Sequence, residues 1–179
     1  MLVYSQTTKI IKDQEGVVAN RIDEIDATIL ELLQDRGRMK RSAVADVVGL
    51  SVSAVSERMR KLEERGVLQG YHALVDPKRL HFDITAIIRV SVDGSEHYPA
   101  FVEEATSMDE VLELHSITGE GSHVMKVRTK NTTTLERFLS RVQGIAGVTG
   151  TSTSIVLSTF KETRALPAEP MELFDAEDE

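Results

Sequence analysis

Basic side chains gather in one short stretch of the chain, residues 36–61. Only Asp46 and Glu57 oppose them there, so the stretch has a net charge of +5. Salt screens exposed charges beyond about 8–10 Å, so phosphate binding depends on local rather than total charge. The stretch therefore predicts a phosphate-binding surface, with a solvated helix face as the alternative. The basic residues are Arg36, Arg38, Lys40, Arg41, Arg58, Arg60 and Lys61.

The chain as a whole is acidic, with 21 Lys+Arg against 29 Asp+Glu in 179 residues. The charge is unevenly divided. Residues 20–80 carry 11 basic and 10 acidic side chains, a net charge of +1, whereas residues 81–179 carry 8 and 17, a net charge of -9. We therefore expect any nucleic-acid contact to lie in the N-terminal part.

Several function classes are disfavoured by what the chain lacks. It has no cysteine, which removes thiol nucleophiles and thiolate metal sites and fits a cytoplasmic protein. It has no apolar run of about 18 residues and no secretory leader, so we expect no membrane association. Catalytic motifs are missing, and the histidines lack metal-ligand spacing, although His115 and His123 flank one loop and could approach each other. We expect no cofactor, no metal ion and no enzyme activity.

Three helices are predicted in the N-terminal part from apolar residues at helical spacing. The first covers about residues 23–34. The second covers residues 41–48 and ends at Gly49, which tolerates a positive φ. The third begins after a serine cap, Ser51 or Ser53, and ends at residues 65–66. Its inward positions are Val55, Met59 and Leu62.

The second and third helices and the glycine turn between them are typical of a helix-turn-helix. Residues 68–75 are predicted to be a short β segment that could form a wing. In such motifs the second helix enters the DNA major groove with its N-terminal half. The basic stretch coincides with this motif, which favours a DNA-binding domain over a plain three-helix bundle.

Side chains on the outer face of the third helix are the candidate DNA contacts. Glu57 could instead pair with Lys61, and Arg58 could pair with an acid of the first helix. Ser51 could serve as a cap and a contact together. The predicted base-facing residues are Ser53, Ser56, Glu57 and Arg60. The predicted phosphate contacts are Lys40, Arg41, Ser51, Arg58 and Lys61.

A second domain follows Asp76-Pro77, where the residue before proline is driven out of helix. Its alternating and helical patterns give the order βαββαβ, typical of a ferredoxin-like sandwich, so the fold class is α+β. The predicted elements are strand 84–92, helix 98–107, strands 111–118 and 123–129, helix 133–142 and strand 149–160. The helices are predicted to bury Phe101, Val102, Ala105, Leu135, Phe138, Leu139 and Val142.

Helices are expected to cover one face of this sheet, and the other face is expected to pair with a second copy in a homodimer. The domain plan is an N-terminal extension (1–20), the DNA-binding domain (21–76), a linker (77–82), the ferredoxin-like domain (83–162) and an acidic tail (163–179). Residues 165–179 hold six acids and no base, which predicts a disordered tail.

With these two domains in this order, the chain resembles the Lrp/AsnC family, the feast/famine transcription regulators. The resemblance covers about residues 22–162 and rests on both domains in order. It implies a winged helix-turn-helix that binds promoter DNA, a C-terminal RAM domain that binds a small effector, mostly an amino acid, and dimers that assemble into octamers or other higher oligomers. The matching stretches are residues 22–26, 49–58, 62–71, 75–77, 118–119, 126–127 and 135–139.

The resemblance places the effector between dimers, around the loop at residues 118–123. By itself the Gly119-x-Gly121 spacing predicts only a hairpin turn. The family usually has an acidic residue two positions after Glu120, where this chain has Ser122; Glu120 could compensate for it, or the ligand could differ. The candidate effector residues are Thr118, Gly119, Glu120, Gly121, Ser122 and His123.

Two alternatives remain open for the same architecture. Sirohaem decarboxylase subunits share it and use His and Arg side chains around a tetrapyrrole. The chain could also be an effector-sensing assembly with a non-functional DNA-binding domain. The intact basic helix favours DNA binding.

Overall fold

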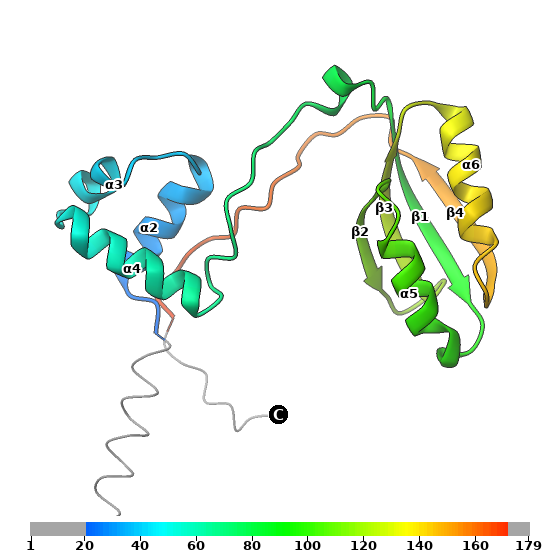
Figure 1. Ribbon diagram of the computed structural model, residues 1–179, viewed down its shortest axis with the longest axis horizontal. Helices are drawn as coiled ribbons and strands as arrows, with labels where there is room; N and C mark the ends of the chain where they lie inside the picture. Colours follow the sequence, from blue (N-terminus) through cyan, green and yellow to red (C-terminus); the bar gives the residue numbers. More distant parts are fainter. Residues whose placement is uncertain (1–20, 172–179) are drawn as a thin grey trace, which may run out of the picture. The chain divides into compact units, whose positions relative to one another are not determined.

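The computed structural model describes residues 21–171, which form two compact units (Figure 1). Among the described residues, the first unit comprises residues 21–74 and 163–171, and the second comprises Val75–Glu162. The N-terminal extension, residues 1–20, and the end of the acidic tail, residues 172–179, lie outside the described residues.

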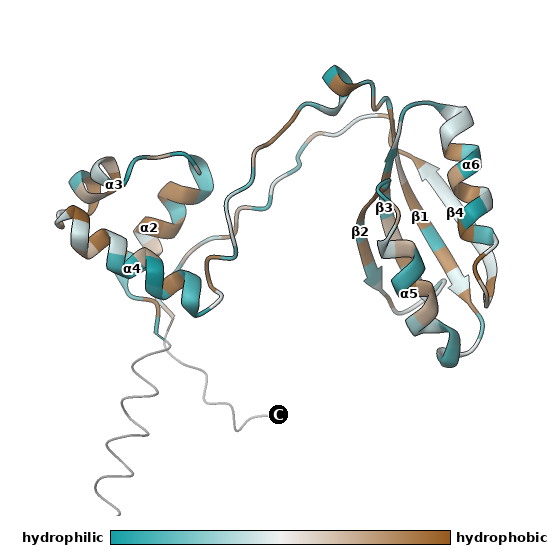
Figure 2. Cartoon of the chain, in the orientation of Figure 1, coloured by the Kyte–Doolittle hydropathy of each residue, from teal (hydrophilic) through white to brown (hydrophobic). Residues whose placement is uncertain are grey.

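The first unit contains the three predicted helices, α2 (Glu24–Asp35), α3 (Arg41–Val48) and α4 (Val52–Glu64). Their apolar stripes meet in one core, in which Ile29, Val44, Val55 and Leu62 are fully buried. Figure 2 shows apolar and polar residues alternating along α4, as expected for a helix with one buried face. The predicted helix-turn-helix is therefore present.

Local capping explains where these helices begin and end. The Asp23 carboxylate accepts a hydrogen bond from the backbone N–H of Asp26 at 2.8 Å, and Ser51 Oγ accepts one from that of Ala54 at 3.2 Å. Of the two predicted caps of α4, Ser51 is therefore the one used. Gly49 ends α3 with a φ of 70°, the left-handed conformation that the glycine was predicted to supply.

The predicted β segment at residues 68–75 is wrong. In the described part of the chain these residues form no strand and pair with none. Most of them are exposed, including Tyr71, Leu74 and Val75. A strand needs a partner to satisfy its backbone groups, and an alternating pattern by itself does not supply one.

The second unit has the predicted βαββαβ order. Its elements are β1 (Ile84–Val92), α5 (Tyr98–Thr106), β2 (Val111–Ser116), β3 (His123–Thr129), α6 (Thr132–Gln143) and β4 (Val148–Ile155), with short 3-10 turns at Pro77–Leu80 and Ser95–His97. The sheet order is β2-β3-β1-β4 and all three pairings are antiparallel. This is the predicted ferredoxin-like sandwich.

One face of the sheet packs on both helices. Alternate residues of β1, from Ala86 to Val92, share a core with Phe101 of α5 and Phe138 of α6. Val102 was predicted to point inward but is 38% exposed, because it follows Phe101 around the helix and turns out of the core. Leu139 is only partly buried.

Two strands are shorter than predicted. β2 ends at Ser116 and β4 at Ile155, although the sequence pattern continues to residues 118 and 160. The backbone N–H of Val156 still donates to the carbonyl of Thr85 at 2.9 Å, but Leu157 and Phe160 are almost fully exposed. Strand length is set by the pairing with a neighbour: β4 pairs with β1 as far as Ile155, opposite Ala86, and β2 pairs with β3 as far as Ser116, opposite His123.

The chain returns to the first unit at Thr163. Disorder was predicted for residues 165–179, but residues 165–171 take a defined path in the first unit, where Leu166 and Met171 form hydrogen bonds. The boundary between the units also falls between Leu74 and Val75, two residues before the predicted one. The predicted linker contains a 3-10 turn, in which Asp76 accepts from the N–H of Lys78 at 2.9 Å.

Candidate nucleic-acid interface and ligand loop

The four predicted base-facing residues lie along one side of α4. Ser53, Ser56, Glu57 and Arg60 are spaced three and four residues apart, which places them on one stripe of a helix. Val55, Met59 and Leu62 are buried on the opposite side. The core packing therefore determines which side chains α4 presents to solvent.

The serines near the start of α4 use part of their hydrogen-bonding capacity within the helix. Ser51 Oγ and Ser53 Oγ lie 3.0 Å apart, and Ser56 Oγ donates to the carbonyl of Val52 at 2.8 Å. The Ser56 hydroxyl can therefore still accept a hydrogen bond, but its own hydrogen is already donated to Val52. Ser53 is exposed and remains the most accessible hydroxyl of the predicted stripe.

Arg60 makes a double hydrogen bond to a carboxylate on its own helix. Its Nε and Nη2 atoms lie 2.9 and 2.6 Å from the two oxygens of Glu57, and Nη1 also pairs with Glu64. The bond to Arg60 holds the pKa of Glu57 below its ordinary value. Lys61 lies 3.8 Å from Glu57, so the predicted alternative pairing is also confirmed. The bidentate hydrogen bond between Glu57 and Arg60 was not predicted from the sequence.

Arg58 lies on a different side of α4 from Arg60. Its Nη1 atom donates to Asp26 at 2.8 Å and to Asp23 at 2.7 Å, which raises the pKa of the guanidinium. Asp26 is nearly buried. The alternative that Arg58 pairs with acids of the first helix is therefore confirmed, and the phosphate role predicted for it is untested.

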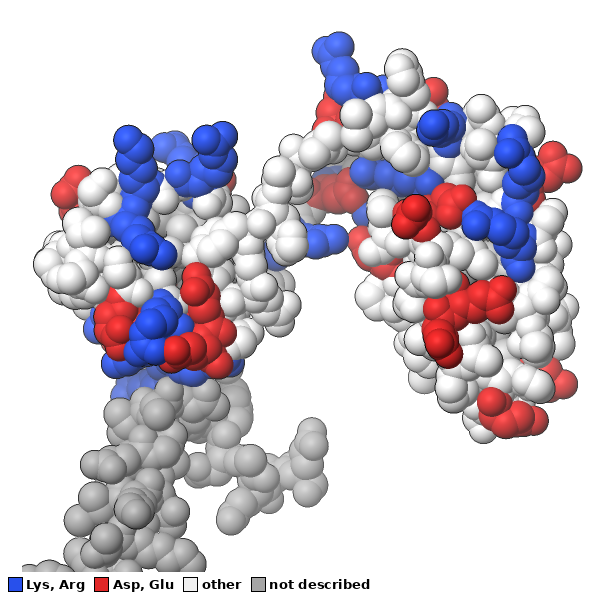
Figure 3. Space-filling view, viewed as in Figure 1, with Lys and Arg blue, Asp and Glu red and all other residues white. Residues whose placement is uncertain are grey.

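The cations before and at the start of α3 differ from Arg58 and Arg60 in their surroundings. Arg38, Lys40 and Arg41 are exposed, and among the described residues none of them forms an ion pair. Figure 3 shows blue side chains predominating along one edge of the first unit and a mixed group of blue and red elsewhere on it. Arg38, which is in the predicted basic stretch but not among the predicted phosphate contacts, is exposed like Lys40 and Arg41.

In the second unit, the loop between β2 and β3 borders a shallow cavity of about 440 Å³, lined by Arg89, Ile117, Thr118, Glu120 and Val124. Gly119 and Gly121 have φ values of 99° and 81°. A Cβ at Gly121 would lie 3.0 Å from the carbonyl oxygen of Val90, so a side chain cannot enter there without displacing β1. Arg89 was not predicted, because only the sheet register brings it to this loop.

Ser122 turns its hydroxyl toward β1. Its Oγ accepts from the N–H of Val92 at 3.1 Å, donates to the carbonyl of Val90 at 3.2 Å, and lies 2.9 Å from Nδ1 of His123. Ser122 stands where the family usually has an acidic residue, and its hydroxyl group is already used in hydrogen bonds within the second unit. Of the six predicted effector residues, Thr118 and Glu120 line the cavity, and Ser122 supports the loop.

His123 is 2% exposed and packs against aromatic rings. Its ring centre lies 4.9 Å from that of Tyr98 and 4.8 Å from that of Phe101. Burial lowers the pKa of its imidazole. His115 pairs with Val124, one position along from His123, so the two histidines point to opposite faces of the sheet. They do not approach each other, contrary to what their spacing allowed.

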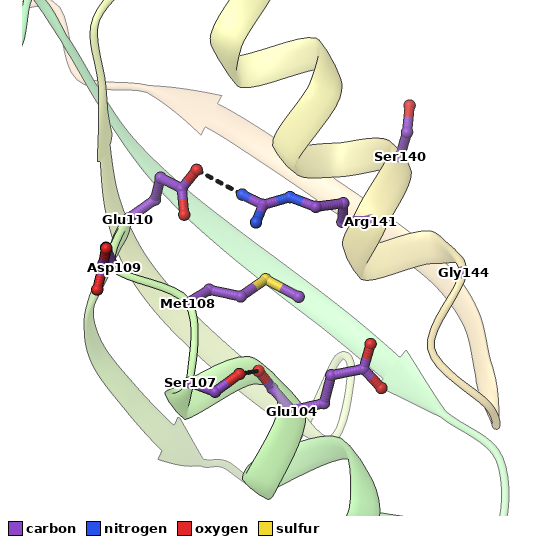
Figure 4. Close-up of a pocket in the computed structure, with 8 residues that line it drawn as sticks. All are labelled: Glu104, Ser107, Met108, Asp109, Glu110, Ser140, Arg141 and Gly144. Carbon is purple, nitrogen blue, oxygen red and sulfur yellow. Dashed lines mark hydrogen bonds and ion pairs between the residues drawn. The ribbon is translucent and has the colours of Figure 1, made fainter.

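A second cavity, of about 580 Å³, lies beside the C-terminal ends of α5 and α6 (Figure 4). Glu110 and Arg141 form an ion pair across it, and Glu104 and Asp109 also line it. The positive charge of Arg141 is therefore already paired. Among the described residues, no group of three or more His, Asp or Glu side chains is arranged to hold a metal ion.

A helix-turn-helix followed by a βαββαβ sandwich with a glycine loop is the architecture of DNA-binding regulators that carry a separate ligand-binding domain. Family models agree with both parts. Residues 22–69 match a winged helix-turn-helix DNA-binding model, and residues 85–166 match the Lrp/AsnC ligand binding domain. In the described chain, no helix is long and apolar enough to cross a membrane.

Curated relatives match over nearly their full length. The HTH-type transcriptional regulator FL11 of Pyrococcus horikoshii is 38% identical over 146 residues, which are 82% of this chain and 96% of the relative. The regulator LrpA of Mycobacterium tuberculosis is 38% identical over 146 residues, 80% of this chain and 95% of that one. The chain belongs to the Lrp/AsnC family of transcriptional regulators.

Solved structures show the same two-domain fold. A transcriptional regulator from Neisseria meningitidis in complex with L-methionine has a TM-score of 0.78 and 28% identity, covering 81% of this chain and 96% of that one. The feast or famine regulatory protein of M. tuberculosis complexed with L-methionine has a TM-score of 0.73 and 35% identity, covering 81% and 98%. These relatives are regulators, so the sirohaem alternative is not favoured.

Proposed function

We propose that this regulator binds promoter DNA with α4 in the major groove, Ser53, Ser56, Glu57 and Arg60 facing the bases. The proposal rests on the exposed stripe of α4 together with Lys40 and Arg41, which are exposed, form no ion pair among residues 21–171 and are assigned to phosphates. Bases are read by side-chain hydrogen bonds, whereas phosphates are held by charge. Arg38 extends the phosphate-binding edge.

The main test is DNA binding by the full chain to its own promoter region, measured by fluorescence anisotropy across a salt series. Arg60→Ala is expected to weaken binding to the best site by about 1–3 kcal/mol, the value of one bidentate contact to guanine. Binding to unrelated DNA should change much less. Glu31→Gln on α2, an exposed residue without an ion pair in the described chain, is the control. Unaltered specific binding by Arg60→Ala would contradict the groove assignment.

The ligand is proposed to be an α-amino acid held at the 118–123 loop. Arg89 and Glu120 line the same cavity, and neither forms an ion pair within residues 21–171. One cation and one anion that line the same cavity suit a zwitterion, the Arg89 guanidinium for the carboxylate and Glu120 for the ammonium group. Glu120 takes the role that Ser122 does not fill. The L-methionine in two similar structures supports this ligand class.

A thermal-shift series with the twenty amino acids tests the ligand class, since a bound ligand raises the melting temperature by mass action. We expect at least one amino acid to stabilise the protein and its methyl ester not to do so. Arg89→Met should abolish the shift, and Lys130→Met, an exposed control, should keep it. Equal stabilisation by the ester would exclude Arg89 as the carboxylate anchor.

A homodimer, assembling further to an octamer or another higher oligomer, is proposed for the cytoplasmic protein. The sheet face away from α5 and α6 supports this, because neither helix of the second unit covers it. Light scattering coupled to gel filtration checks the mass. A chain that remains monomeric at micromolar concentration would contradict the assembly, and with it the pairing of two DNA-binding units.

A further inference from the structure

The C-terminal segment, residues 163–171, makes a specific contact with α2. The Gln34 side chain donates from Nε2 to the carbonyl oxygen of Leu166 at 2.8 Å and accepts at Oε1 from the N–H of Leu166 at 2.7 Å. One amide group therefore satisfies both backbone groups of a single residue. This is the pairing that a neighbouring strand would provide, so it fixes the position of the segment along α2.

Two more contacts follow along the same segment. Ala168 packs against the core of the first unit, and the N–H of Met171 donates to the carbonyl of Ile22 at 3.2 Å in an isolated antiparallel bridge. Pro167 and Pro170 lie between these anchors. Proline restricts the free segment, so less conformational entropy is lost when it docks. Figure 1 shows the red segment ending beside the start of α2.

The chain passes between the two units twice. The chain leaves the first unit at Leu74 and re-enters it at Thr163, so the first unit is attached to the second at two points of the sequence. The family matches end at residues 69 and 166, and the anchors at Ala168 and Met171 lie beyond them. A single connection would leave the DNA-binding unit free to rotate about one linker.

We propose that residues 163–171 are a strap that docks in cis on α2, through Gln34 and Ile22, and restrains the motion of the DNA-binding unit relative to the ligand-binding unit. The partner of this α2 surface is thus a segment of the same chain. If the proposed function also holds, the strap is a route by which ligand binding reaches the DNA-binding unit.

Amide hydrogen exchange tests the docking without reference to DNA or ligand. Gln34→Leu removes both hydrogen bonds at similar side-chain size, and exchange at Leu166 should become about tenfold faster. Gln143→Leu is the matched control, because it removes an amide hydrogen bond of 2.9 Å to Thr151 in the second unit. Equal exchange at Leu166 in the wild-type chain and Gln34→Leu would overturn the docking. Protection that disappears on dilution would indicate docking between copies and overturn the cis arrangement.

Pulsed electron paramagnetic resonance tests the restraint, and the absence of native cysteine makes labelling specific. Spin labels at Glu31→Cys and Glu136→Cys, in chains diluted with unlabelled protein, report the spread of distances between the units. Gln34→Leu, and a second variant that ends after Arg164, should broaden this distribution, while Gln143→Leu should leave it unchanged. The same width in all variants would overturn the restraint even if the docking is real.

Discussion

The Nη2 atom of Arg60 lies 2.6 Å from Oε1 of Glu57, one turn earlier on the exposed face of α4. Both residues belong to the proposed base-reading stripe, so Arg60 must leave this carboxylate before it can bind a guanine. The pair therefore opposes binding to DNA that offers no better partner. An exposed pair of this kind contributes little to folding and can be broken by a bidentate base contact.

Glu57→Gln should consequently bind non-specific DNA more tightly at low salt. It removes one negative charge from the proposed base-reading stripe and releases Arg60, and we expect a gain of about three- to tenfold. Fluorescence anisotropy with random-sequence duplexes measures it. Glu31→Gln makes the same chemical change on α2 and should have a smaller effect. A loss of non-specific affinity in Glu57→Gln would contradict the competition between Glu57 and DNA.

Lys40 and Arg41 should contribute affinity without sequence preference. Each phosphate contact changes the slope of log K against log salt by about 0.9, so Lys40→Ala and Arg41→Ala should each reduce the slope by about one. The ratio of specific to non-specific binding should hardly change. Lys130→Ala in the second unit is the control. If the slopes match that of the wild-type chain, these cations do not contact phosphates.

Arg58 should matter for the stability of the first unit. Its removal leaves Asp26, which is 7% exposed, without its cationic partner. Because an unpaired buried charge is costly, Arg58→Met should lower the free energy of unfolding by about 2 kcal/mol. Denaturant unfolding followed by circular dichroism measures it. Arg36→Met is the matched control, since within residues 21–171 Arg36 pairs only with its exposed neighbour Asp35, and its effect should stay within about 0.5 kcal/mol.

The ion pairs of Arg58 with Asp23 and Asp26 should make the first unit less stable in acid. Burial opposes ionisation of Asp23, but the N–H of Asp26 and the Arg58 guanidinium outweigh it and hold the pKa below its ordinary value. The unfolded chain therefore takes up a proton first, so this stabilisation is present above about pH 4 and is lost as the pH falls further. Asp23→Asn keeps the cap and removes the charge. Its unfolding free energy should depend less on pH between about 4 and 2.

His123 should make the second unit sensitive to mild acid. Burial lowers its pKa below the ordinary value of about 6.5, so below that pH the unfolded chain binds the extra proton more readily than the folded chain. Stability from the neutral ring is complete above about pH 6.5 and falls as the pH drops towards 5. His123→Gln should flatten this dependence in thermal unfolding, whereas the exposed His115→Gln should not. An unchanged profile in His123→Gln would assign the effect to another group.

Local patterns were sufficient to predict α3, β1 and β3 to the residue and the other elements to within a few residues. These elements depend on residues close together in the sequence, such as Gly49 with its left-handed backbone or the alternating residues from Ala86 to Val92. The prediction of a β segment at residues 68–75 was wrong for the opposite reason, because a strand depends on a partner far along the chain. The predicted ends of β2 and β4 were wrong for the same reason.

The sequence by itself determined the two domains, the order of their elements and the stripe of α4 that faces solvent, because helical and strand periodicity are written in neighbouring residues. Only the tertiary structure decided which charges are already paired. It separated Arg58, bound to Asp23 and Asp26, from Lys40 and Arg41, which form no ion pair within residues 21–171. It also brought Arg89 to the ligand loop and Leu166 to Gln34. These contacts join residues far apart in the chain, so their distances arise only when the core has packed.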